Sequence, residues 1–241
     1  MGKSRISVVI PTLNEEKYLG ALLKSIKKQT YKRYEIIVID SHSTDKTVNI
    51  AKKYRSKIFY SKRGNIAAAK NVGIKNASGN IIAFIDADMT LSNGVFASIV
   101  REFEKDNEER IAAIEPKQEL SLAGISRKNI RIFTFVTWLI KLNKFITFAI
   151  GQPAATGCVF CRATSIKKAG MFNVHLKVSE DREYYSRLRK YGRFITINDV
   201  VFVSFRRQEK EGLIRPALKY YASDLSAVLF KKVNRGMKPE R

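Results

Sequence analysis

The sequence predicts an α/β protein whose mostly parallel β-sheet is flanked by helices. Short apolar runs of strand length alternate with segments of helical spacing through the first half of the chain, as in repeated β–α units. The runs lack the polar alternation of half-exposed strands, which indicates burial on both faces of a parallel sheet. With 241 residues, of which 45% are apolar, the chain is long enough to form a complete core as one domain.

The elements of the first half follow one another closely, and parallel strands joined in this way need right-handed crossovers. We expect Asn14 to cap the first helix and Thr44 or Asp45 to cap the second, because short polar side chains accept hydrogen bonds from exposed helix N–H groups. In order, the elements are strand Ile6–Ile10, helix Glu16–Lys28, strand Glu35–Asp40, helix Asp45–Tyr54, strand Lys57–Tyr60, helix Asn65–Asn76 and strand Ile81–Ile85.

The second half is predicted to complete the same globule. Cys158 and Cys161 are the only cysteines, which is too few for a structural zinc site. We expect both to pack inertly on a strand, with their thiols on opposite faces because the residues are three positions apart. The expected elements are helix Asn93–Asn107, strand Ile111–Glu115, strand Gly157–Cys161, a helix that begins near Ser165 and helix Asp181–Tyr191.

Two amphipathic segments add to this pattern. Ile130–Ile150 has the length of a membrane span, but Arg131, Lys141 and Lys144 would make full burial in lipid expensive. Its polar residues recur every three or four positions, which favours a helix lying at a membrane surface; packing on the core or on a dimer interface is the alternative. Leu213–Val233 has the same character, with basic residues beside its apolar stripe.

The charge balance requires an anionic partner. Lys and Arg number 45 against 22 Asp and Glu, which leaves a net charge of +23. Nucleic acid, a phospholipid surface and phosphorylated substrates all satisfy this charge, although the lysines are scattered and no nucleic-acid-binding motif is present. The first apolar run is interrupted by Pro11 and by polar residues from Asn14 onward, so we expect a cytoplasmic protein without a secretory leader.

The strand Ile81–Ile85 ends in two carboxylates, Asp86 and Asp88, one residue apart. Carboxylates this close repel each other, and a cation beside them relieves the repulsion. Open α/β sheets bind ligands at the carboxyl ends of their strands, so the pair predicts a metal-dependent site at that edge.

Two other interpretations of the pair exist. The sequence from Asp86 to Leu91 also matches the first motif of haloacid-dehalogenase-type phosphatases, in which the first aspartate is a nucleophile. That motif normally lies near the start of the chain, whereas three β–α units precede it here. Alternatively the carboxylates cap the next helix, although Ser92 or Asn93 already offers that cap.

Three further motifs precede the carboxylate pair. The first strand runs into a Pro-x-x-Asn-Glu sequence, the second ends in Asp-x-x-Ser-x-Asp, and the third helix contains Asn-x-Gly. Together with Asp-x-Asp they resemble the inverting family 2 glycosyltransferases of the GT-A fold, over about the first 100 residues and more loosely from Gly157 to Arg193. The matching positions are Pro11, Asn14, Glu15, Asp40, Ser43, Asp45, Asn71, Gly73, Asp86 and Asp88.

The resemblance implies a GT-A domain over residues 1–212 with a nucleotide-sugar donor, UDP- or GDP-linked. Residues 1–115 would bind the donor, 124–150 would be the amphipathic insertion, 151–212 the acceptor half and 213–241 a basic tail. Asp88 would ligate Mg²⁺ or Mn²⁺, with Asp86 reaching the ribose or the metal through water. The other residues expected at the donor are Pro11, Thr12, Asn14, Glu15, Asp40, Ser41, Asp45, Lys70 and Asn71. For each of them, capping or loop packing is the alternative.

Inversion needs a base opposite the departing diphosphate, and the resemblance suggests Asp181, with Glu180 second. A lipid phosphate acceptor would need no base, in which case Asp181 would hold the acceptor; stabilisation of a helix start is the other alternative. Arg206 and Arg207 could bind the diphosphate or an acceptor phosphate. The net charge and the amphipathic segments favour a lipid-linked acceptor, such as a polyprenyl phosphate, at an anionic membrane surface; a soluble glycan acceptor is the alternative.

Two departures from the family pattern matter. The family commonly has a second acidic residue after the one that matches Asp40, where it contacts the nucleotide base; this chain has Ser41, followed by His42. The sequence therefore leaves the choice between UDP and GDP open. The Gln-x-x-Arg-Trp motif of processive synthases is absent, so long-chain polymerisation is not expected.

Overall fold

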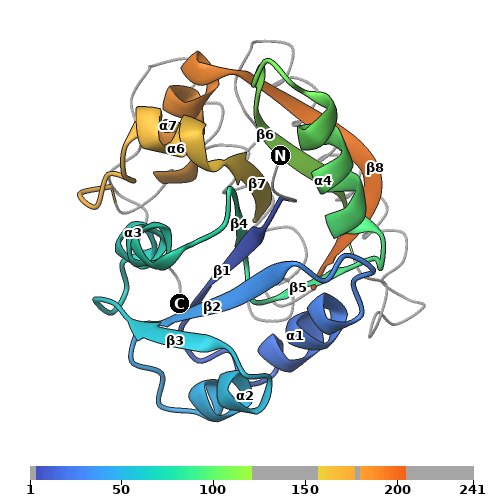
Figure 1. Cartoon of the computed structure of the whole chain (residues 1–241). Coiled ribbons are helices and arrows are strands. Elements are labelled where there is room, and N and C mark those ends of the chain that lie inside the picture. The colour runs from blue at the N-terminus through green and yellow to red at the C-terminus, as the bar shows by residue number, and fades with distance from the viewer. Residues whose placement is uncertain (1–3, 121–156, 177–179, 205–241) are drawn as a thin grey trace, which may run out of the picture.

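The computed structural model describes residues 4–120, 157–176 and 180–204 (Figure 1). Helices cover both faces of a single sheet in this part of the chain, which confirms the predicted α/β class. The strands are β1 (Ile6–Thr12), β2 (Tyr34–Asp40), β3 (Lys57–Tyr60), β4 (Ile81–Ile85), β5 (Met89–Leu91), β6 (Ile111–Leu120), β7 (Cys158–Arg162) and β8 (Arg193–Val203). The helices are α1 (Leu19–Lys27), α2 (Thr47–Lys53), α3 (Ile66–Asn76), α4 (Val95–Lys105), α6 (Ala163–Ala169) and α7 (Glu180–Leu188), with a short 3₁₀ turn η2 (Arg189–Tyr191).

The sheet has the order β3-β2-β1-β4-β7-β6-β8-β5. Its first half is parallel as predicted, with β1 between β2 and β4 and with β3 beside β2. The second half is mixed, because β7 runs antiparallel to both β4 and β6, and β5 runs antiparallel to β8. The sequence did not predict β5, which is too short to show a period, or β8, most of which is only half-buried.

The hydrophobic core consists of two layers, one on each face of the sheet. Val8 points into the layer formed with α1, α2 and α4, whereas its neighbour Val9 points into the layer formed with α3, α6 and α7. Cys158 and Cys161 divide in the same way, each fully buried and free, as their spacing on a strand predicts. Figure 1 shows these two groups of helices on opposite sides of the sheet.

Helix α3 lies unusually close to β1. A Cβ atom at Gly73 would be 2.2 Å from Cγ1 of Val9, so only glycine allows this approach. The glycine of the Asn-x-Gly motif therefore has a packing role. It fixes the distance between α3 and the middle of the sheet, and thereby the position of the side chains that α3 presents at the carboxyl edge.

The start of α1 differs from the prediction. The helix begins at Leu19, not at Glu16, and Asn14 does not cap it. Asn14 has a left-handed backbone conformation (φ 55°), and its side-chain oxygen accepts a hydrogen bond from the N–H of Thr44 instead. The expected cap was wrong because a long-range partner competes for the same side chain.

Several predictions lie outside the described residues, namely those for Arg206, Arg207, the amphipathic insertion at 124–150 and the basic tail at 213–241. Within the described ranges, no helix has both the length and the apolar character needed to cross a membrane.

Candidate active site

Thr12 and Asp40 lie side by side where β1 and β2 end. They are register partners, and Thr12 Oγ1 donates a hydrogen bond to Asp40 Oδ1 at 3.1 Å. Ser43 donates to the same carboxylate twice, from its hydroxyl to Oδ1 (2.6 Å) and from its N–H to Oδ2 (2.8 Å). Asp40 is fully buried. Its carboxylate therefore fixes the turn after β2. Pro11, which precedes Thr12 on β1, is buried within the sheet.

The segments that follow β1 and β2 are held together by hydrogen bonds. The N–H of Asn14 donates to Ser43 Oγ at 2.9 Å, and the N–H of Thr44 donates back to Asn14 Oδ1 at 2.9 Å. One residue further, the N–H of Glu15 donates to Thr47 Oγ1 at 2.7 Å. These bonds join two loops about 30 residues apart in the sequence into one continuous rim at the edge of the sheet.

Asp45 belongs to the same rim. Its Oδ1 accepts from the N–H of Thr47 at 2.9 Å, and its Oδ2 accepts from the N–H of Glu16 at 3.0 Å. Burial opposes ionisation, but these hydrogen bonds outweigh it and lower the pKa of Asp45. The carboxylate thus serves the start of α2 and the rim, as the capping alternative predicts, and a contact with a nucleoside stays a prediction.

An aromatic pair and a hydroxyl pair lie next to Asp40. Tyr60 is the register partner of Asp40 on β3, and its ring stacks on the imidazole of His42 with centroids 5.7 Å apart and an interplanar angle of 20°. The Oγ atoms of Ser41 and Ser61 are 3.2 Å apart. Tyr60 is 56% exposed, so this edge presents an aromatic surface to solvent.

Asp86 and Asp88 occupy a tight turn between β4 and β5, and both are half-buried. The N–H of Asp86 donates to the carbonyl of Gly157 at 2.8 Å, and the carbonyl of Asp88 accepts from the N–H of Ser204 at 3.0 Å. A Cβ atom at Gly157 would be 2.5 Å from Asp86 Oδ2. The carboxylate of Asp86 therefore lies directly over the backbone of Gly157, in space that only a glycine leaves open.

This turn suits a hard divalent cation. Two carboxylates one residue apart offer the oxygen ligands that Mg²⁺ and Mn²⁺ prefer, and both side chains are half-buried at the edge of the sheet. Among residues 4–120, 157–176 and 180–204, no group of three or more His, Cys, Asp or Glu side chains could hold a metal by itself. Ligands from outside this set, such as diphosphate oxygens and water, would have to complete the coordination.

Lys70 and Asp181 form a buried ion pair between α3 and α7. The ammonium of Lys70 donates to Asp181 Oδ1, and the Lys70 side chain is 2% exposed against 18% for Asp181. Burial acts to lower the pKa of Lys70, but the carboxylates of Asp181, Asp86 and Glu180 outweigh it and raise that pKa above its usual value. The lysine predicted to bind the donor therefore pairs with Asp181, the residue predicted to be the base.

Helix α3 also holds the loop that precedes α7. Asn71 Nδ2 donates to the carbonyl of Phe172 at 2.9 Å, and the N–H of Phe172 donates to Asn71 Oδ1 at 2.8 Å. Asn65 caps α3 through Ala68 and donates from Nδ2 to the carbonyl of Val174 at 2.9 Å. Asn71 thus uses its amide to position the loop, and its predicted contact with the donor stays a prediction.

The sequence did not predict Gly157, Phe172, Tyr60 or Tyr185 as site residues. Gly157 and Phe172 carried a usable signal, since the first opens the expected strand Gly157–Cys161 and the second lies within residues 151–212, the predicted acceptor half. Tyr60 and Tyr185 carried no such signal, because tyrosines are common in apolar helices and strands.

The architecture defines the class of the protein. A Rossmann-like sheet with an Asp-x-Asp turn at its carboxyl edge and a mixed second half is the GT-A fold of nucleotide-sugar-dependent transferases. The family described as Glycosyl transferase family 2 matches residues 7–169, which is more than half of the chain. The chain therefore belongs to glycosyl transferase family 2.

Its relatives include proteins of bacteria and archaea. It is 37% identical over 203 residues to the minor teichoic acid biosynthesis protein GgaB of Bacillus subtilis, covering 77% of this chain and 21% of that protein. It is 37% identical over 92 residues to the poly(ribitol-phosphate) β-N-acetylglucosaminyltransferase TarS of Staphylococcus aureus, covering 35% of this chain and 16% of TarS. A dolichyl N-acetyl-α-D-glucosaminyl phosphate 3-β-D-2,3-diacetamido-2,3-dideoxy-β-D-glucuronosyltransferase of Methanococcus voltae is 36% identical over 129 residues, covering 50% of this chain and 37% of that protein. The chain thus spans a minor part of each of these relatives.

Solved structures share the fold. The mannosyltransferase PcManGT of Pyrobaculum calidifontis, in complex with GDP-Man and Mn²⁺, superimposes with a TM-score of 0.68 at 19% identity, covering 98% of this chain and 66% of that one. Residues 1–349 of S. aureus TarS, in complex with UDP-GlcNAc, superimpose with a TM-score of 0.65 at 20% identity, covering 97% of this chain and 68% of that one. At these identities the likeness establishes the GT-A fold alone.

Proposed function

We propose that the chain is a metal-dependent, inverting glycosyltransferase that moves a sugar from a UDP- or GDP-sugar to a phosphate-bearing, membrane-associated acceptor, in the first place a polyprenyl-phosphate-linked one. The proposal rests on one observation. The turn of Asp86 and Asp88 packs against Gly157, at the same sheet edge as Asp40. Relatives with this fold form complexes with UDP-GlcNAc or with GDP-Man and Mn²⁺, which supports both donor classes.

In this proposal the donor lies along the carboxyl edge of the sheet. Its nucleoside would lie near the rim around Asp40, and its diphosphate near Asp86 and Asp88. A bound Mg²⁺ or Mn²⁺ would neutralise charge on the departing diphosphate. The half-buried setting of the two aspartates keeps them accessible from the edge and partly shielded from water, which strengthens their attraction for a cation.

Asp181 is the proposed base, with Glu180 beside it at the start of α7. In inverting transfer, the acceptor oxygen bonds to the anomeric carbon while the bond from that carbon to the diphosphate breaks. The diphosphate leaves with the bonding electrons, and the base takes the acceptor proton. Asp181 Oδ1 is occupied by Lys70, whereas no described residue donates a hydrogen bond to Oδ2. Oδ2 is thus available for an acceptor hydroxyl.

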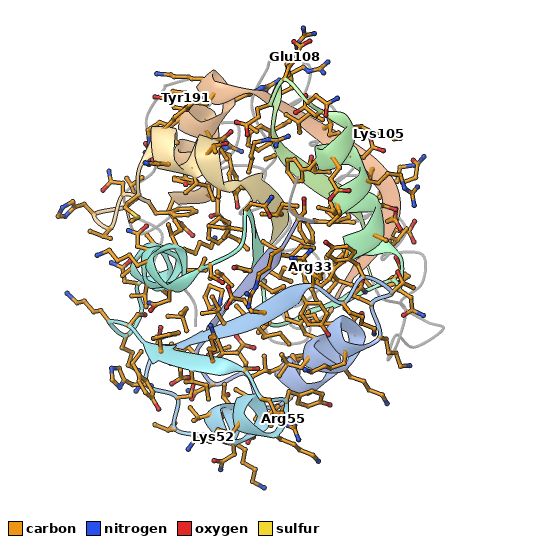
Figure 2. The ribbon with its side chains drawn as sticks, in the orientation of Figure 1. Arg33, Lys52, Arg55, Lys105, Glu108 and Tyr191 are labelled. Atoms are coloured by element: carbon orange, nitrogen blue, oxygen red, sulfur yellow. The ribbon has the colours of Figure 1, made fainter. Side chains whose placement is uncertain are left out.

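The acceptor class follows from charge and from the relatives. A protein of net charge +23 attracts anionic acceptors, and the names of two relatives contain a poly(ribitol-phosphate) and a dolichyl-linked sugar phosphate. Basic side chains radiate from separate elements of the body, such as Lys52 and Arg55 around the end of α2 and Lys105 at the end of α4 (Figure 2). Attraction to an anionic membrane at the cytoplasmic face is consistent with a charge spread in this way.

Thermal unfolding with a panel of donors tests the proposed function. UDP-GlcNAc, UDP-glucose and GDP-mannose are each added with Mn²⁺ or with EDTA. We expect one nucleotide class to raise the midpoint only with Mn²⁺, since ligands that bind the native state stabilise it. We expect Asp88→Asn to abolish the shift. The absence of any metal-dependent shift in the unmodified protein would overturn the proposal.

Flotation with liposomes tests the acceptor side. Vesicles of phosphatidylglycerol and phosphatidylcholine are compared with pure phosphatidylcholine vesicles at low and moderate salt. Binding that needs the anionic lipid supports a membrane-associated acceptor. Binding to neither vesicle, together with transfer to a soluble poly(ribitol phosphate), would identify the soluble glycan as the acceptor.

A further inference from the structure

Lys70 is a buried charge whose position stability alone does not explain. Its side chain is 2% exposed, and its ammonium also lies 5.3 Å from the centroid of the Phe172 ring. Burying an ion pair costs desolvation that the attraction between the charges barely offsets, so well-packed apolar residues usually serve stability equally well. A buried lysine therefore points to a role in the chemistry of the site.

The surroundings of Lys70 span both halves of the proposed site. Asp181 contacts it directly, and the charges of Asp86 and Glu180 reach it as well. Asp86 belongs to the turn at the diphosphate end, whereas Asp181 and Glu180 open α7 at the acceptor end. Lys70 thus pairs directly with the carboxylate at the acceptor end, while the carboxylate of Asp86 acts on it only through its charge.

Tyr185 borders the same cluster. It lies one helical turn after Asp181, is fully buried, and its hydroxyl has no hydrogen-bond partner among the described residues. Burial, together with the negative charge of Asp181 and Asp86, raises the pKa of Tyr185. Tyr185 therefore stays neutral, and the charged partner that holds the carboxylate of Asp181 is Lys70.

We propose that Lys70 is a positioning residue for sugar transfer. Its ammonium holds Oδ1 of Asp181 so that Oδ2 faces the acceptor. The inference rests on the proposed function and deepens it, since it assigns Lys70 to the alignment of the base and not to direct contact with the donor.

Gly73 and Asn71 support this role. Gly73 seats α3 against β1, which sets how far Lys70 reaches toward the carboxyl edge. Asn71, the next residue, holds the backbone of Phe172, whose ring lies against the Lys70 ammonium. One helix therefore fixes both the lysine and the aromatic surface beside it.

The experiment compares Lys70→Met, Asp181→Asn and the double variant, with Lys75→Met as a control on the exposed side of the same helix. The probe is the donor, UDP-GlcNAc or GDP-mannose, that stabilises the unmodified protein with Mn²⁺. Two quantities are measured: the Kd of the matching nucleoside diphosphate by calorimetry, and the release of that diphosphate when water is the acceptor at saturating donor. Circular dichroism checks the fold of each variant.

We expect Lys70→Met to slow hydrolysis about 10²-fold, since a misplacement of about 1 Å can cost that much, and to leave the Kd within about threefold. The double variant should be no slower than Asp181→Asn, because the lysine acts through the aspartate. Lys75→Met should match the unmodified protein in both quantities.

Three results would overturn the inference while leaving the proposed function intact. These are hydrolysis by Lys70→Met at the unmodified rate, a Kd that weakens in proportion to the rate, and rate losses that multiply in the double variant. If Lys70→Met does not fold, Lys70→Gln replaces it, and the comparison of the double variant with Asp181→Asn still decides. Failure of the unmodified protein to bind any donor would instead overturn the proposed function.

Discussion

Asn71 and Phe172 exchange two hydrogen bonds across 101 residues of sequence, at 2.9 Å from the Asn71 amide to the Phe172 carbonyl and at 2.8 Å in the reverse direction. The Asn71 amide thereby donates to and accepts from the Phe172 backbone, as a neighbouring β-strand would. It joins α3 to the loop before α7. The asparagine of the Asn-x-Gly motif is in this structure a link between the two halves of the domain.

Replacing Asn71 with alanine should loosen this link. Two hydrogen bonds of about 1 kcal/mol each are lost, so we expect a destabilisation of about 2 kcal/mol in urea unfolding. Donor hydrolysis should fall as well, because Phe172 lies against Lys70. The control is Asn76→Ala, which removes a single local hydrogen bond to the carbonyl of Val72 on the same helix. Equal stabilities for the two variants would contradict the role of Asn71 as the link between α3 and the loop before α7.

Gly157→Ala should impair the carboxylate turn. The new methyl group would lie 2.5 Å from both Asp86 Oδ2 and Met89 Cε, so the turn must shift. Overpacking of this kind costs about 1–3 kcal/mol. We expect a weaker Mn²⁺-dependent thermal shift with the donor, because Asp86 moves.

The matched control for Gly157→Ala is Gly20→Ala in α1, where a Cβ atom meets nothing closer than Ile50 at 3.9 Å. That variant should be neutral or slightly stabilising, since alanine favours helix. A normal metal response in Gly157→Ala would show that Asp86 tolerates displacement.

Glu35 should make stability depend on pH. Its carboxylate accepts hydrogen bonds from Ser7, Ser78 and Lys57, which outweigh burial and lower the pKa of Glu35 from 4.5 to about 2. The ionised form is therefore favoured in the native state. Its contribution, about 3 kcal/mol for a shift of this size, is complete above about pH 4.5 and is lost as the pH falls toward 2.

Urea unfolding of Glu35→Gln at pH 7 and pH 3 tests this dependence. The variant should be destabilised at pH 7, and the difference from the unmodified protein should shrink at pH 3. Glu108→Gln is the control, since Glu108 is exposed and pairs only at the surface with Arg110. A difference for Glu35→Gln that does not change with pH would exclude ionisation as the cause.

Tyr60→Ala should weaken nucleotide binding without affecting the fold. Tyr60 is 56% exposed and stacks on His42 beside Asp40, where the proposed function places the nucleoside. Stacking of a base on an aromatic ring contributes about 1–3 kcal/mol, so the Kd of UDP or GDP should rise at least about fivefold. Tyr191→Ala, at an exposed tyrosine in η2, is the control and should leave the Kd unchanged. If the Kd for Tyr60→Ala is unaltered, the nucleotide base does not stack on Tyr60 and must bind elsewhere on the rim.

The two cysteines should be unreactive in the native protein. Both thiols are fully buried on β7, and burial raises the pKa of each well above its usual value. We expect a thiol reagent such as DTNB to modify neither at pH 8 under native conditions and both in guanidinium chloride. Rapid native modification of either thiol would show that β7 opens readily.

The sequence by itself determined the first half of the fold. The apolar runs that became β1, β2 and β4 are buried on both faces, a pattern that only a covered parallel sheet satisfies, and the parallel register then brings Thr12 to Asp40. The carboxylate turn was equally visible, because polar residues that directly follow a buried strand must lie at the edge of the sheet. The opposite faces of Cys158 and Cys161 followed from strand geometry alone.

Only the tertiary structure decided how the second half closes onto the first. The antiparallel insertion of β7 beside β4, which places Gly157 under Asp86, depends on pairing between segments more than 70 residues apart. Three further contacts are of the same kind. Asn14 bonds to the neighbouring loop, Asn71 holds the backbone of Phe172, and Lys70 pairs with Asp181. Local spacing carries no information about them, because hydrogen bonds and ion pairs at long range are chosen by the folded geometry. That geometry turns a lysine expected at the donor into the partner of the proposed base.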